Sequence, residues 1–147
     1  MTWQQLLGAN RVRAHRTSKQ ELDDLRGVID RDLHDAGISG LSADRSFATA
    51  YNAALQTAKM AIACAGYRVV GQGHHQLSFE AAQLAVGPTV SAFGAYFDLC
   101  RRRRNMLDYD VANVVSDTEA AELLQKARDF KREIETWIAA HHPGLVP

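Results

Sequence analysis

Hydrophobic residues recur along most of the chain at spacings of three and four positions, which is the period of an amphipathic helix. Ser18 and Glu21 have the spacing of a capping box in front of the first stripe, and we expect that helix to end at Gly37. The second stripe covers residues 43–65, and the three glycines of residues 66–73 should end it. The first half of the chain therefore predicts two long helices.

The second half of the chain predicts two further helices, the first of them interrupted. Ser78 can cap the beginning of that helix, and Gly87 with Pro88 breaks or restarts it, because proline is tolerated in a first turn. Ser116 and Glu119 repeat the capping-box spacing in front of the last stripe. Because β-branched alternation is nearly absent, we expect no sheet. The predicted fold class is all-α, an antiparallel up-and-down helical bundle of four to five helices.

One domain accounts for the whole chain. A length of 147 residues is typical of a single domain, so we place its boundaries at 1–147, with residues 1–17 as a partly irregular N-terminal arm. The inward positions of the stripes predict a buried core made of Phe47, Tyr51, Leu55, Ile62, Phe93, Phe97, Leu123, Phe130, Ile134 and Trp137.

Composition and charge indicate which class of protein this is, but they do not identify a binding partner. Hydrophobic residues make up 46% of the chain and charged residues 23%, which is typical of a globular protein and excludes intrinsic disorder. The polar N-terminal residues, and the lack of an apolar run near the ~18 residues of a membrane helix, favour a cytoplasmic protein with no membrane contact. Seventeen basic residues balance seventeen acidic ones, so no global field attracts nucleic acid.

The cysteines and histidines do not indicate a redox or metal centre. Cys64 and Cys100 lie far apart in apolar stretches, so we expect two reduced core thiols. The two histidine pairs, residues 74–75 and 141–142, have no Cys, Asp or Glu at helical ligand spacing. We therefore expect no metal and no other cofactor.

The most unusual polar feature is the run of four arginines from Arg101 to Arg104. Arginine is the cation best suited to phosphate and carboxylate groups. Helical phase places Arg104 on the same stripe as Phe97 and Leu107, where a charge costs several kcal/mol unless it is paired. Two interpretations remain open. Arg104 forms a salt bridge with Asp108 at the helix end, or it lines a cleft or dimer seam and binds phosphate.

The same helix carries a second apolar row, formed by Tyr96, Leu99 and Met106. A helix with two apolar rows is more hydrophobic than one buried face requires, so one row is free to pack against another subunit. The pattern predicts a homodimer whose seam lies along this helix.

The segment Arg103-Arg104-Asn105-Met106-Leu107-Asp108-Tyr109-Asp110 resembles the signature of HEPN domains (higher eukaryotes and prokaryotes nucleotide-binding) of the stand-alone bacterial type. Other segments resemble the family in the same order, so that the resemblance covers nearly the whole chain, although only the Arg-Asn-Tyr cluster is specific. These segments are Lys19–Ala36, Ala43–Leu55, Gly66–Arg68, Gly73–His75 and Asp117–Trp137.

The resemblance implies a helical bundle that is usually a homodimer, with the arginine motifs facing across the seam. Many HEPN domains are metal-independent ribonucleases of toxin–antitoxin, antiphage or RNA-processing systems, and others are non-catalytic partners, often of a small nucleotidyltransferase. Arg104 matches the family's arginine and Asn105 its polar residue, whereas Tyr109 stands about where the family has its histidine. The residues nominated are Arg104, Asn105 and Tyr109 for catalysis, Arg101, Arg103 and Arg104 for phosphate binding, and Asp108 and Asp110 as supporting residues.

The missing motif histidine favours binding over cleavage. Cleavage of RNA through its 2′-OH needs a group that moves protons near neutral pH, and Tyr, with a pKa of ~10, replaces His poorly as a base. We therefore expect a HEPN-like module in a toxin–antitoxin or defence-type system. It binds RNA or nucleotide phosphates, or docks a partner such as a nucleotidyltransferase, without efficient catalysis. Two alternatives stay open, a metal-independent endoribonuclease with an altered Arg104–Asn105–Tyr109 centre and a purely structural dimeric interaction protein.

Overall fold

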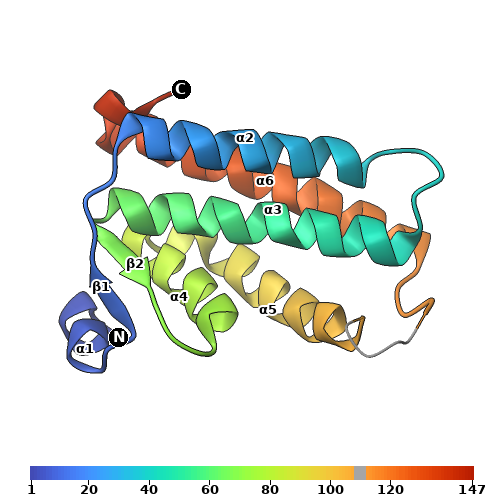
Figure 1. Cartoon of the computed structure of the whole chain (residues 1–147), viewed down its shortest axis with the longest axis horizontal. Coiled ribbons are helices and arrows are strands. Elements are labelled where there is room, and N and C mark those ends of the chain that lie inside the picture. The colour runs from blue at the N-terminus through green and yellow to red at the C-terminus, as the bar shows by residue number, and fades with distance from the viewer. Residues whose placement is uncertain (108–111) are drawn as a thin grey trace.

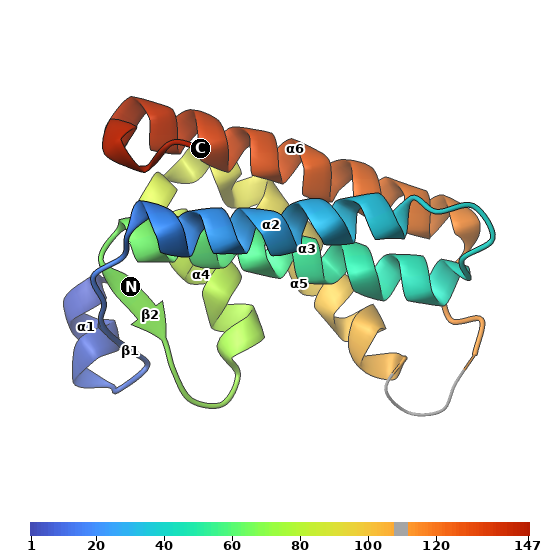
Figure 2. The ribbon, with the colours of Figure 1, turned by 45° about the horizontal axis from the view of Figure 1, so that its top comes forward.

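An alanine-rich helix, α3 (Ala43–Cys64), lies at the centre of the fold (Figure 1). The structure, a computed structural model, describes residues 1–107 and 112–147. Helices α2 (Lys19–Ala36) and α6 (Asp117–His141) pack along α3, and α4 (His74–Val86) and α5 (Ser91–Met106) cover its other side (Figures 1 and 2). The predicted all-α bundle is confirmed.

The N-terminal arm is more ordered than the sequence suggests. It folds into helix α1 (Trp3–Gly8) and strand β1 (Val12–Ala14), which pairs antiparallel with β2 (Tyr67–Val69). The ring of Trp3 stacks on that of Tyr67 with centroids 4.2 Å apart. The expectation of no strand is therefore wrong for these residues, because strands of three residues are too short to show an alternating pattern.

Side-chain caps set the beginnings of two long helices. The Ser18 hydroxyl accepts a hydrogen bond from the Glu21 amide at 3.1 Å, in front of α2. Ser116 and Glu119 form the complete capping box of α6, with hydrogen bonds of 3.1 and 3.2 Å. Both helices therefore begin where the sequence places them.

Helix α4 begins earlier than expected. Its N-cap is Gly73, whose φ of 71° lies in the left-handed region that favours glycine. Ser78, expected to be the cap, is buried inside the helix and donates its hydroxyl hydrogen to the His74 carbonyl. The next break comes as predicted, because Gly87 has a φ of 111° and Pro88 begins the 3-10 turn Pro88–Val90 that leads into α5.

Aromatic rings join α3, α4, α5 and α6 in one core. Phe97 is fully buried, and its ring centroid lies 5.1 Å from that of Phe79 and 5.2 Å from that of Phe130. The residues predicted for the core are buried except Phe93 and Trp137, which are partly exposed and pack against the core's edge.

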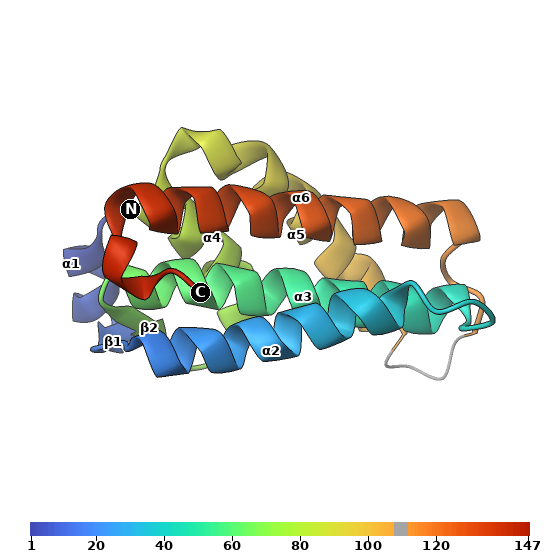
Figure 3. The same ribbon diagram turned by 90° about the horizontal axis from the view of Figure 1, so that it is seen from above.

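A buried arginine ties α2 to α6 and to the C-terminal turn Pro143–Leu145, which lie together when the bundle is seen from above (Figure 3). Arg26 is 6% exposed and donates two hydrogen bonds of 2.9 Å to the two oxygens of Glu135. It also donates to Asp23 at 2.8 Å and to the Leu145 carbonyl at 2.7 Å. The buried positive charge of Arg26 is thereby balanced by two carboxylates, and a carbonyl oxygen accepts a further hydrogen bond.

Both cysteines are free, as the sequence predicts. Cys100 is buried and Cys64 half-buried, and burial raises the pKa of each thiol to about 11. Thiols with such pKa values stay protonated at neutral pH, so they behave as apolar core groups. None of the helices in the described ranges combines the length and hydropathy of a membrane span.

Substitution of Arg26 by Ala should lower the free energy of unfolding by about 3 kcal/mol, because it leaves Glu135 partly buried without its partner. The matched control is Arg132→Ala, since the Arg132 side chain is 72% exposed and only approaches Asp129, at 3.4 Å. That control should change the free energy of unfolding by less than about 0.5 kcal/mol. Urea denaturation followed by circular dichroism measures both, and equal effects would contradict the structural role of Arg26.

Candidate functional site

The four consecutive arginines do not share one environment around α5. Arg103 donates from Nη2 to the Val114 carbonyl at 2.9 Å and lies 2.7 Å from Glu119 Oε2 at the start of α6. The structure thus gives Arg103, nominated for phosphate binding, a role in holding α5 to α6. The Arg102 side chain is 68% exposed.

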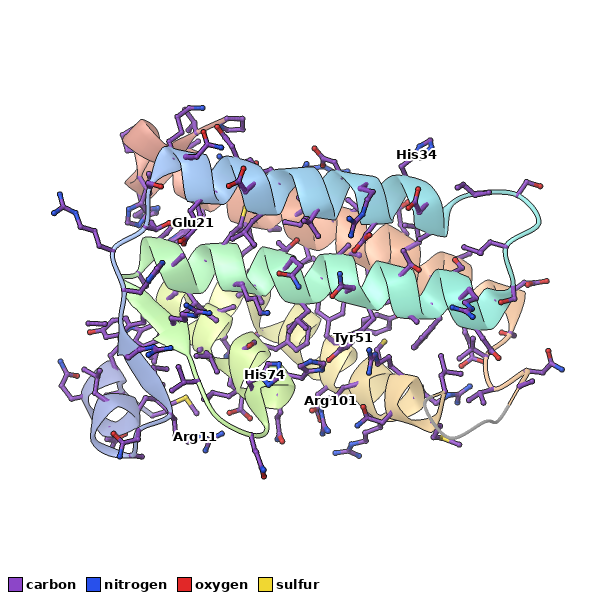
Figure 4. All side chains as sticks on the ribbon, in the orientation of Figure 1. Arg11, Glu21, His34, Tyr51, His74 and Arg101 are labelled. Carbon is purple, nitrogen blue, oxygen red and sulfur yellow. The ribbon has the colours of Figure 1, made fainter. Side chains whose placement is uncertain are left out.

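Arg101 and Arg104 act electrostatically on Tyr51 of α3. The Arg101 Nε donates to Asp98 at 3.1 Å, and Arg104 is half-buried. Burial raises the pKa of the Tyr51 phenol, and the charges of Arg101 and Arg104 oppose that rise. Figure 4 shows Tyr51 between α3 and α5, with Arg101 on the same side of the bundle.

The hydroxyl of Tyr51 is buried without compensation. The residue is 1% exposed, and its oxygen has no hydrogen-bond partner within the described ranges. An unpaired buried polar group costs about 1–3 kcal/mol, so such groups are rare and call for an explanation. A ligand oxygen could accept from this hydroxyl after the surrounding side chains move aside, because the atom itself is buried.

A histidine from the first turn of α4 completes the surroundings of Tyr51. The His75 ring centroid lies 5.9 Å from that of Tyr51 and 4.5 Å from that of His74. Burial lowers the pKa of His75 to about 4, helped by the charges of His74, Arg104, Lys59 and Arg101. His75 is therefore neutral at pH 7.

These residues come from three helices, and we call them together the α3–α4–α5 cluster. Its members are Tyr51 and Lys59 of α3, His74 and His75 of α4, and Arg101 and Arg104 of α5. The sequence pattern does not single out His75, because the resemblance places the motif histidine a few positions after Arg104. The signal available was Gly73, which begins α4 and so places the two histidines in its first turn.

The remaining nominated residues do not join this cluster in the described part of the chain. Asn105 is exposed near the end of α5. Asp108, Tyr109 and Asp110 lie outside the described residues, so the altered Arg104–Asn105–Tyr109 centre and the pairing of Arg104 with Asp108 stay predictions.

The apolar row expected at a dimer seam reaches the surface. Leu99 is 61% exposed and Met106 49% exposed, and Tyr96 is partly buried. A surface of this kind is compatible with a second subunit, and the homodimer stays a prediction.

Asp44, in the first turn of α3, fixes the chain between α5 and α6. Its carboxylate accepts hydrogen bonds from the amides of Asn113, Val114 and Val115 at 2.7, 3.1 and 3.2 Å. Because Arg103 binds the Val114 carbonyl, this segment is held from α3 and from α5. The end of α5 therefore has a defined position beside α3.

The cluster is made of cationic side chains, two histidines and a phenol. Within residues 1–107 and 112–147, no three His, Cys, Asp or Glu side chains are grouped as a metal ion would require.

No protein-family model, curated protein or solved structure matches the chain. The function must therefore be inferred from the geometry and charge of the cluster.

The lowered pKa of His75 should make stability depend on pH. The unfolded chain takes up the His75 proton near pH 6.5, whereas the folded protein takes it up only near pH 4. The free energy of unfolding should therefore fall as the pH is lowered from 6.5 to 4, and this part of the fall should be missing in His75→Asn. Urea denaturation at several pH values measures the difference, and NMR titration of the imidazole checks the pKa. Parallel pH profiles for the two proteins would contradict the assignment.

Proposed function

We propose that the protein binds the phosphate groups of RNA on the α3–α4–α5 cluster. The observation that carries the proposal is the buried Tyr51 hydroxyl, which has no partner in the described part of the chain. The charges of Arg101 and Arg104 act on it, and the His75 ring centroid lies 5.9 Å from that of Tyr51. A phosphate oxygen accepts hydrogen bonds from a phenol and from guanidinium groups, and its charge offsets those of the arginines.

Two cations of the cluster, Arg101 and Lys59, are not fully balanced by ion pairs with the described residues. Asp98 is shared, since it accepts from Arg101 at 3.1 Å and lies 3.4 Å from Arg102. Lys59 is half-buried and makes no hydrogen bond or ion pair with the described residues. This imbalance supports anion binding over a purely structural role for the arginines.

The resemblance to HEPN domains supports RNA as the source of the phosphate groups. A toxin–antitoxin or defence-type role and a nucleotidyltransferase partner rest on that resemblance alone, and we propose them only in that sense.

Arg101→Gln should weaken the binding of a fluorescent single-stranded RNA with a 5′-hydroxyl end by about tenfold, because glutamine cannot donate a charge-assisted hydrogen bond to phosphate. Arg102→Gln is the matched control, since it removes the neighbouring exposed arginine and should leave the affinity nearly unchanged. Fluorescence anisotropy at several salt concentrations measures both. The slope of log K against log salt should become shallower by about 0.7 for each phosphate that the variant no longer neutralises.

Tyr51→Phe separates binding from folding in the same assay. Because the hydroxyl has no partner among the described residues, its removal should maintain or raise the melting temperature while it weakens RNA binding. No measurable RNA affinity in the wild type, or equal affinity in wild type, Arg101→Gln and Tyr51→Phe, would overturn the proposal.

Metal-independent RNA cleavage is a second candidate function, favoured by His75. The sequence has no histidine shortly after Arg104, but the folded cluster contains one. In this reaction the ribose 2′-oxygen attacks phosphorus and its proton passes to neutral His75. The bond from phosphorus to the 5′-oxygen then breaks, and the leaving oxygen takes a proton from water, which gives a 2′,3′-cyclic phosphate and a 5′-hydroxyl. The protonated His75 returns its proton to the solvent.

Bound phosphate would also improve His75 as a base. Burial lowers its pKa most, and the charges of His74 on α4, Arg104 and Arg101 on α5 and Lys59 on α3 add to that effect. A phosphodiester charge between them opposes that effect and raises the pKa towards the working pH, where general bases are most effective.

Labelled RNA incubated with the protein and a metal chelator tests this candidate. Cleavage should yield 2′,3′-cyclic phosphate ends and should be lost in His75→Asn and in Arg104→Ala, while Arg102→Gln cleaves as the wild type does. RNA that is bound but stays intact would support RNA binding and contradict cleavage. Cleavage that survives in His75→Asn would rule out His75 as the base.

A further inference from the structure

A separate cleft of about 620 Å³ lies between the β1–β2 ladder and helices α2, α3 and α4. We call it the β2 cleft. Its size falls in the range of about 300–1,000 Å³ that is usual for small-molecule sites. Leu25 and Ile62 contribute apolar surface, and Arg13, Lys59, Arg68 and His74 contribute basic groups. Figure 4 labels two residues of its wall, Glu21 on α2 and His74 on α4.

Two arginines of this cleft are placed against each other. Arg13 of β1 and Arg68 of β2 are direct partners in the antiparallel ladder, so their side chains share one face of it. Like charges directly opposite each other destabilise a strand pair. Both residues are exposed, and neither makes an ion pair within residues 1–107 and 112–147.

The other charges of the cleft offset this pair only in part, through the attraction between Glu21 and Arg68. Lys59 is half-buried, and burial together with the nearby Arg68 lowers its pKa. Among the described lining residues the acid is Glu21, and it is already engaged. Its carboxylate lies 2.8 Å from His15 Nε2 and accepts from the Thr17 hydroxyl at 3.0 Å. The cleft therefore keeps a surplus of positive charge next to an apolar wall.

We propose that the β2 cleft binds a phosphate monoester, with the phosphate near Arg13, Arg68 and Lys59 and the organic part against Leu25 and Ile62. A phosphate monoester carries close to two negative charges near pH 7 and offers three acceptor oxygens. It can therefore accept from two guanidinium groups and an ammonium group at once. A single carboxylate would leave more of the repulsion between Arg13 and Arg68 in place.

The phosphate monoester has two possible sources, a free mononucleotide or the 5′-phosphate end of an RNA chain. The inference does not depend on the proposed RNA binding, because Arg13 and Arg68 line the cleft and Arg101 belongs to the α3–α4–α5 cluster. Lys59 and His74 are close to both sites, so they are unsuitable for telling the sites apart.

Isothermal titration calorimetry with adenosine 5′-monophosphate, adenosine and inorganic phosphate tests the site. The monophosphate should bind, and both adenosine and inorganic phosphate should bind more weakly, because each lacks one half of the ligand. Arg68→Gln should weaken monophosphate binding by about tenfold, and Arg101→Gln should leave it unchanged. Arg13→Gln is the second variant and should act as Arg68→Gln does.

The same variants give a readout that needs no ligand. Removal of one of two opposed arginines should maintain or raise the melting temperature of the ligand-free protein, so loss of binding cannot be attributed to unfolding.

RNA with a 5′-hydroxyl should bind equally to wild type and Arg68→Gln. A gain in affinity from a 5′-phosphate that disappears in Arg68→Gln would identify the RNA end as the source, and no such gain would identify the free mononucleotide.

Three results would overturn the inference. They are no binding of the monophosphate to the wild type, equal binding to wild type and Arg68→Gln, and loss of monophosphate binding in Arg101→Gln. The last result would place the phosphate in the α3–α4–α5 cluster. If RNA with a 5′-hydroxyl does not bind while the monophosphate does, the proposed function fails and the β2 cleft stands.

Discussion

The packing of α3 against four other helices is the constraint on which the rest of the structure depends. Small side chains let the neighbouring helices approach α3 closely, and most of its residues are buried as a result. A polar side chain on α3 must therefore find a partner inside the protein. Thr57 does so by donating to the Ala53 carbonyl at 2.8 Å, whereas Tyr51 does not within the described ranges. The small residues concerned are Ala50, Ala53, Ala54, Ala58 and Ala61.

The balance of seventeen basic and seventeen acidic residues conceals a separation of charge across the bundle. Between α2 and α6 the cations meet carboxylates, as Arg26 does with Glu135 and Lys131 does with Asp30. Towards α4 and the strands, Lys59 and Arg68 have no such partner in the described part of the chain. The side that stabilises the fold is thus distinct from the side that carries uncompensated charge.

The long helices could be read from the sequence because their ends and inward faces are marked locally. The stripe over residues 43–65 corresponds to α3, Ala43–Cys64, and the caps at Ser18 and Ser116 are where the spacing puts them. The spacing places the start of α4 too late, because a glycine with positive φ stands where a side-chain cap is expected.

The sequence indicates the candidate site only in part, because the site depends on contacts between helices. The stripe correctly buries Tyr51, but no pattern shows that its hydroxyl lacks a partner among the described residues. His75 and Arg101 are brought together by the packing of α4 against α5, which sequence spacing does not reveal.

Lys59 links the two regions of uncompensated charge. It lines the β2 cleft and also contributes to the lowered pKa of His75 in the α3–α4–α5 cluster. An anion bound in the cleft would offset the charge of Lys59. The positive potential at the cluster would then be lower, and His75 would take up a proton more readily. If both proposed sites bind phosphate, occupation of one must weaken the attraction of the other. Salt reduces this coupling, since screening acts over about 8 Å at physiological ionic strength.

Two phosphate groups joined in one chain would overcome the repulsion more easily than two separate anions, because the second then binds at a high effective concentration. The arrangement of charge therefore favours a ligand with several linked phosphates over a pair of independent ones.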